Sequence, residues 1–124
     1  MDIDYELEGK KIVIKECSFG KASKLKEAVS KLVVKNGIKL EVLFGNCTIE
    51  EMIKGILALD TDTDCHNALV DCLCECKIDD KVIIKEALMA DEFVKKHYYK
   101  LVKDVFEVNI APFIEALASL LLVQ

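Results

Sequence analysis

The chain has 124 residues, a length that fits a single domain over residues 1–124. Because 52% of these residues are hydrophobic and only one is proline, the composition excludes a disordered or low-complexity chain. Its 22 acidic and 17 basic residues give a net charge of -5, which argues against a nucleic-acid partner because such proteins present a basic face to phosphate. The N-terminus is acidic, unlike a secretory signal, and the longest apolar run is far shorter than the roughly 20 residues that are needed to span a bilayer. We therefore predict a cytoplasmic protein with no membrane partner.

Residues 1–17 are predicted to form a β-hairpin. The first strand alternates apolar with acidic residues, the turn contains Gly9, and a β-branched run over residues 11–15 forms the second strand. An isolated hairpin is only marginally stable, so we expect it to pack against the rest of the chain.

Residues 18–124 are predicted to form a helical part, because apolar residues recur at helical spacing behind several capping residues. The predicted helices cover residues 18–35, 48–59, 64–76, 91–109 and 112–122. Two further segments, residues 38–44 and 81–88, fit either a strand or the start of a helix. The fold class is therefore mainly α with a small β part (α+β): an N-terminal hairpin followed by about five helices packed as a bundle.

Three cysteines occupy alternate positions in the string DCLCEC, and a further cysteine precedes them. On a helix, Cys65, Cys72 and Cys76 share one apolar stripe, whereas Cys74 points to nearly the opposite side. A regular helix cannot bring Cys72, Cys74 and Cys76 to one metal ion, and the paired cysteine knuckles of zinc sites are absent from the sequence. We therefore predict buried, structural cysteines and no cofactor. The alternative is a small metal- or thiol-responsive protein that uses Cys65, His66, Cys72 and Cys76.

Two other patterns look like functional sites but fit structural roles better. Asp60, Asp62 and Asp64 match the first positions of a calcium-binding loop, yet Cys65 stands where that loop needs glycine, so we interpret the acids as helix caps. The basic and aromatic string KKHYYK, at residues 95–100, places its lysines on the solvent side of a helix. Neither histidine lies near a nucleophile motif, so we predict that the chain is not an enzyme.

Three strings carry a resemblance: LEGKKIVIKECSFGKASKLKEAV, CLCECKIDDKVIIKEAL and EFVKKHYYKLVKDVFEVNIAPFIEAL. Their content and order resemble the tail assembly chaperones of long-tailed phages and prophages of Gram-positive bacteria. That family typically ends with an aromatic and apolar helix followed by a Val-x-x-Asn-x-x-Pro-Phe-like string. Ile114 stands where the family often has a second aromatic residue. The matching positions here are Tyr98, Tyr99, Val102, Val105, Phe106, Asn109, Pro112 and Phe113.

The resemblance implies a non-enzymatic chaperone that holds the long, aggregation-prone tape measure protein and helps recruit tail tube protein before the tail polymerises. A second copy of the chain is a further candidate partner, and a bacterial adaptor with no phage role is an alternative function. The last predicted helix carries more apolar residues than one core face needs, so both a partner contact and burial in the core remain open. The residues predicted to bind partners are Phe106, Asn109, Pro112, Phe113, Leu117 and Leu121.

Overall fold

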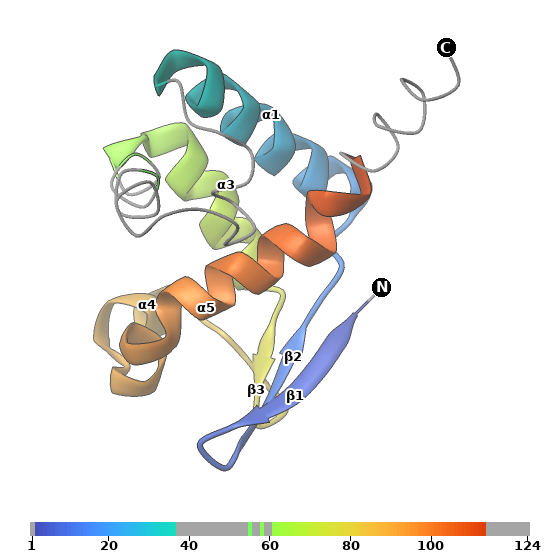
Figure 1. The fold of residues 1–124 in the computed structure, drawn as a ribbon. Coiled ribbons are helices and arrows are strands. Elements are labelled where there is room, and N and C mark those ends of the chain that lie inside the picture. Colours follow the sequence, from blue (N-terminus) through green and yellow to red (C-terminus); the bar gives the residue numbers. More distant parts are fainter. Residues whose placement is uncertain (1, 37–54, 56–57, 59–60, 114–124) are drawn as a thin grey trace.

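The computed structural model describes residues 2–36, 55, 58 and 61–113 (Figure 1). Its helices in this part of the chain are α1 (Phe19–Asn36), α3 (Thr63–Leu73), α4 (Lys85–Ala90) and α5 (Glu92–Asn109). Its strands are β1 (Ile3–Leu7), β2 (Lys10–Ile14), β3 (Lys77–Ile78) and β4 (Lys81–Val82). Helix α5 lies between the sheet and the pair formed by α1 and α3, so the predicted α+β class is confirmed.

The sheet is antiparallel with the strand order β1-β2-β3-β4. The predicted N-terminal hairpin is confirmed, with Tyr5 opposite Ile12 and a turn in which Glu8 and Gly9 both have positive φ. Such a turn has the twist that two antiparallel strands need. Alternate residues of β2 face inward, and the side chains of Ile12 and Ile14 are completely buried.

A second hairpin, formed by β3 and β4, extends this sheet and was not predicted. Its turn residues, Asp79 and Asp80, both have positive φ, a conformation that aspartate tolerates better than most residues. The backbone and side chain of Asp79 both bond to Lys11 in β2, at 2.8 and 2.9 Å. The ambiguous segment at residues 81–88 therefore contains both a short strand and the start of α4.

The long helices begin near their predicted positions. Asp91 caps α5 by accepting a hydrogen bond from the Val94 amide at 3.1 Å. The cap of α3 is Asp62, one of the acids interpreted as helix caps, and its carboxylate accepts a hydrogen bond from the Cys65 amide at 2.8 Å. Helix α3 also ends at residue 73 instead of about 76, because the chain turns there to enter β3.

The expectation of about five bundled helices does not match the structure. Within the described residues there are three long helices and the six-residue α4. Helix α5 packs on a four-stranded sheet, which consists of the N-terminal hairpin together with β3 and β4. The predicted helices at residues 48–59 and 112–122 lie almost entirely outside the described residues.

One core joins the inner face of the sheet to all three long helices. Fully burying each large apolar side chain stabilises the fold by roughly 1.5–3 kcal/mol, so this cluster supplies much of the driving force. Its completely or almost completely buried members include Ile12, Ile14, Leu25, Leu69, Leu73, Leu101, Val105 and Phe106.

The amide side chain of Asn109 ties the chain segment between β2 and α1 to the end of α5. Its Oδ1 accepts a hydrogen bond from the Cys17 amide at 2.8 Å. Its Nδ2 donates to the carbonyl oxygens of Lys15, at 3.4 Å, and Val105, at 3.1 Å. Asn109 is 3% exposed, so water cannot replace these bonds.

A second polar tie joins β1 to α5. The Tyr5 hydroxyl donates a 2.5 Å hydrogen bond to the carboxylate of Asp104, a buried residue. The Lys100 ammonium lies 3.3 Å from the same carboxylate and 4.5 Å from the centroid of the Tyr5 ring. Burial, and then the hydrogen bond to Asp104, raise the pKa of Tyr5 well above its ordinary value.

Replacing Asn109 by alanine leaves the buried Cys17 amide and Lys15 carbonyl without partners. We expect Asn109→Ala to lower the free energy of unfolding by about 2–3 kcal/mol, as measured by urea denaturation. The matched control is Asn67→Ala on the exposed side of α3, which we expect to stay within about 0.5 kcal/mol of wild type. Equal effects of the two substitutions would contradict this role of Asn109.

The raised pKa of Tyr5 predicts a loss of stability in alkali. Unfolded Tyr5 loses its proton near pH 10, whereas folded Tyr5 keeps it, so the stabilising contribution is complete below pH 10 and declines as the pH rises. The stability advantage of wild type over Tyr5→Phe should therefore shrink by about 1.4 kcal/mol per pH unit above pH 10. Urea denaturation of both proteins from pH 8 to 11.5 measures this difference, and a constant difference would contradict it.

Candidate functional site

The predicted partner-binding residues fall into two groups. Phe106 and Asn109 are buried inside the fold, so they are not accessible in this structure. Pro112 is exposed and Phe113 is half-buried, at the point where the chain leaves α5. The other two predicted residues, Leu117 and Leu121, lie outside the described residues.

Phe113 belongs to a surface aromatic pair. Its ring centroid lies 5.9 Å from that of Phe19, with the two planes inclined at 58°. The Lys26 ammonium lies 5.0 Å from the centroid of the Phe113 ring, within the range of a cation–π interaction. Phe19 is 76% exposed, so this pair (named the Phe19–Phe113 surface below) presents an aromatic side chain to solvent.

Asn109 explains why two residues so far apart in the sequence meet. Its side chain holds the Cys17 amide, two residues before Phe19, against the end of α5, four residues before Phe113. Ile110 is buried in the turn that ends α5, and the Phe113 amide donates to its carbonyl at 3.0 Å within the helical residues 111–113. One buried side chain therefore positions both halves of the Phe19–Phe113 surface.

Sequence reasoning missed Phe19. The buried stripe of α1 consists of Ala22, Leu25, Val29 and Leu32, and Phe19 is the first residue of the helix. A large aromatic residue with no assigned place in the core is the signal that could have identified it. Its partner lies 94 positions further along the chain, so only the fold reveals the pair.

The candidate metal residues do not converge on one ion. Cys65, Cys72 and Cys76 are completely buried in the core, whereas His66 is exposed. Among the described residues, no three His, Cys, Asp or Glu side chains are arranged to hold a metal ion. The predicted buried stripe is confirmed for Cys65 and Cys72. Cys76 is buried as well, but it follows the end of α3, so its place on that helix was wrong.

Burial suppresses the reactive form of these thiols. It raises the pKa of Cys65 to about 12 and that of Cys76 to about 11. A hydrogen bond with the Cys17 thiol, together with burial, raises the pKa of Cys72 far above its ordinary value. Thiolate is the nucleophile and the metal ligand, so these cysteines act as small apolar side chains in the core.

The side chain of Cys74 is more exposed than those of Cys65, Cys72 and Cys76, because Cys74 lies at the end of α3 and is only half-buried. At pH 8 a thiol with a pKa of about 12 is ionised in roughly one molecule in ten thousand. We expect iodoacetamide to label Cys74 at least tenfold faster than Cys65, Cys72 and Cys76 in the folded protein. Peptide mapping by mass spectrometry measures this, and denaturant should equalise the rates. Equally fast labelling of folded Cys65 would contradict the burial of that thiol.

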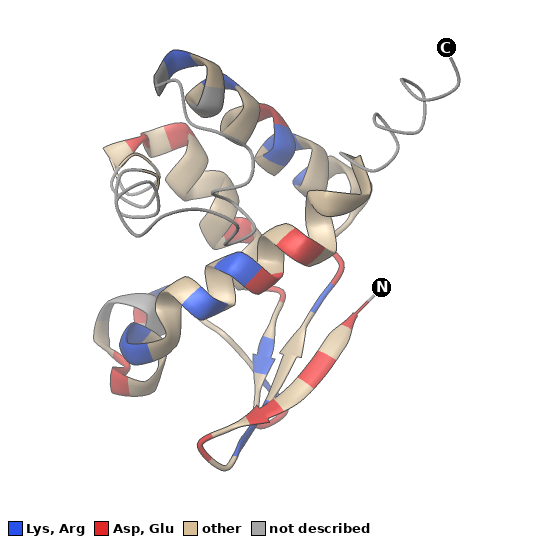
Figure 2. Cartoon of the chain, viewed as in Figure 1, with Lys and Arg blue, Asp and Glu red and all other residues tan. Residues whose placement is uncertain are grey.

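The stretch at residues 108–113 carries no charged side chain, in contrast to the interleaved acids and bases of the sheet and the rest of α5 (Figure 2).

No described helix is long and apolar enough to cross a membrane. A search of curated proteins and a search of solved structures each found no match. Residues 10–121 match the family model described as "Phage tail assembly chaperone protein, TAC". That match covers nearly the whole chain and removes the alternative of an adaptor with no phage role: the chain belongs to the phage tail assembly chaperone family.

Proposed function

We propose that this chaperone binds the tape measure protein and helps recruit tail tube protein before the tail polymerises. The family's role is assembly rather than catalysis and implies contacts with other tail proteins. The chain therefore needs a surface that can bind a protein segment. In this proposal it acts as a single domain, over residues 1–124, in the host cytoplasm.

The observation that carries the proposal is the exposed aromatic pair. Phe19 is one of five large apolar side chains exposed in the described part of the chain, and it packs at a tilt against a second aromatic ring. Aromatic residues are common among the side chains that dominate protein interfaces, because they bury a large area with little loss of conformational freedom. An aggregation-prone partner offers the apolar side chains that such a surface can cover.

The predicted partner-binding residues then divide by role. Pro112 and Phe113 contact the partner directly, together with Phe19. Phe106 anchors the end of α5 in the core, and Asn109 positions the segment that follows, so both act through their neighbours.

Leu117 and Leu121 follow Phe113 at intervals of four residues. Four-residue spacing places side chains on one face of a helix. A helix that continued through these positions would therefore extend the apolar surface beyond Phe113, and we include both leucines in the proposed contact.

Coexpression with the tape measure protein of the same phage tests the proposal. We expect wild-type chaperone to raise the soluble fraction of the tape measure protein and to copurify with it. Phe19→Asp should weaken this binding by roughly 30-fold, the effect of losing a residue worth about 2 kcal/mol to the interface. Because Phe19 is exposed, the substitution should leave the unfolding midpoint nearly unchanged.

The matched control is Val34→Asp, which introduces the same charge at a side chain that is 83% exposed near the other end of α1. We expect this variant to bind like wild type. Loss of binding in both variants, or in neither, would contradict the Phe19–Phe113 surface. Failure of wild type to solubilise or capture the tape measure protein would contradict the function itself. A parallel capture of tail tube protein tests the recruitment step.

A further inference from the structure

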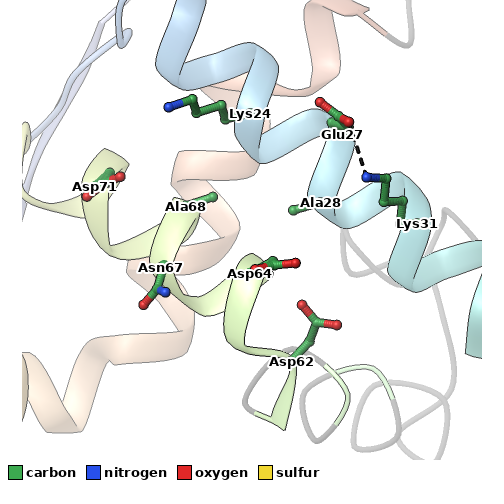
Figure 3. A pocket seen from close by; sticks show the side chains of 9 residues that line it. All are labelled: Lys24, Glu27, Ala28, Lys31, Asp62, Asp64, Asn67, Ala68 and Asp71. Atoms are coloured by element: carbon green, nitrogen blue, oxygen red, sulfur yellow. Dashed lines mark ion pairs between the residues drawn. The ribbon is translucent and has the colours of Figure 1, made fainter.

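A groove of about 370 Å³ runs between α1 and α3, and neither Phe19 nor Phe113 lines it (Figure 3). Its floor contains Ala28 from α1 and Ala68 from α3, whose methyl groups point toward one another. Both alanines are half-buried and pack against the core below them. Since alanine has no side chain beyond Cβ, the two helices meet there without filling the space above.

The two walls of this α1–α3 groove differ in charge. The α3 wall carries Asp62, Asp64 and Asp71 and no basic residue. Asp62 is held by its capping bond to the Cys65 amide. Within the described residues, Asp64 has no hydrogen bond or ion pair, so its charge is available to a ligand.

The α1 wall offsets only part of this negative charge. Lys31 is paired with Glu27 on the same helix at 3.2 Å, which leaves Lys24 as the groove's remaining cation. Four carboxylates therefore face two ammonium groups, and the lining has a net charge of -2. A cationic partner would gain from this imbalance, because unlike charges across an interface favour both binding and orientation.

The spacing on α3 favours a helical partner. Asp64, Ala68 and Asp71 lie at positions i, i+4 and i+7, so they share one face of α3. The two carboxylates are separated by two turns, or about 10 Å along the helix axis, with the alanine between them. A facing helix with two basic side chains seven residues apart, and an apolar side chain between them, has the same spacing.

We propose that the α1–α3 groove binds a helical segment of a tail protein that carries lysine or arginine at positions i and i+7 with a bulky apolar residue between them. The apolar residue packs on the methyl groups of Ala28 and Ala68, and the basic residues pair with Asp64 and Asp71. Ridges of one helix fit the grooves beside another in this way. The inference takes from the proposed function only that the partner is a tail protein.

The test is a titration of isotope-labelled full-length chain with two designed peptides, followed by NMR. Both are alanine-rich helical peptides of about 20 residues, long enough to hold helical structure in water. One carries lysines at i and i+7 around a leucine, and the other carries glutamates in their place. We expect the lysine peptide to shift the amide signals of Ala28, Asp64, Ala68 and Asp71. The glutamate peptide should bind at least tenfold more weakly.

Three variants locate the binding. Asp71→Lys should reduce the affinity for the lysine peptide at least tenfold, and Ala68→Leu should do the same by filling the floor. The matched control, Asp4→Lys, makes the same change of charge on the exposed side of β1 and should bind like wild type. Higher salt should weaken binding to wild type, because exposed charges are screened.

Three outcomes would contradict the proposal that the α1–α3 groove binds a basic helix. They are no binding of the lysine peptide, equal binding of both peptides, and equal effects of Asp71→Lys and Asp4→Lys. These results do not depend on the tape measure protein. A failed coexpression would therefore count against the proposed function alone, and a failed peptide titration against the groove alone.

Discussion

The fold depends on one buried amide side chain, that of Asn109. Three hydrogen bonds connect it to backbone groups before α1 and within α5, in a place that water does not reach. A buried backbone group without a partner costs about 1–3 kcal/mol, so these bonds strongly favour one relative position of the two segments. The start of α1 and the end of α5 are consequently held together, and with them the two aromatic rings of the proposed contact.

The bond between Tyr5 and Asp104 has a similar effect at the other side of α5. It fixes the edge strand β1 against the helix, and Lys100 balances the charge of the carboxylate. The apolar core supplies most of the stability, but apolar packing alone is tolerant of small shifts. Directed polar bonds at Asp104 and Asn109 fix the position of α5 relative to β1 and to the segment that follows β2. The function we propose thus relies on residues that never touch a partner.

Local patterns in the sequence were enough to predict much of the fold. Alternation and a glycine turn predicted the first hairpin, and caps with helical spacing predicted α1, α3 and α5. Helical phase correctly predicted that Cys65 and Cys72 are buried together. The resemblance drew attention to Asn109 and Phe113, and the family match agrees with that resemblance.

The remaining features depend on contacts between distant parts of the chain. The strands β3 and β4 have two residues each, too few to show a periodic pattern, and they form because β2 offers a free edge. Asn109 was expected at the partner surface, but its bonds to Lys15 and Cys17 place it inside. The Phe19–Phe113 surface and the α1–α3 groove likewise arise from residues that only folding brings together.

Hydrogen–deuterium exchange on the chaperone, alone and in complex with the tape measure protein, tests the central claim most directly. If the aromatic pair contacts the partner, amides in the first two turns of α1 and around residues 110–113 should exchange more slowly in the complex. Slower exchange confined to the hairpin of β1 and β2, with the start of α1 unchanged, would contradict it.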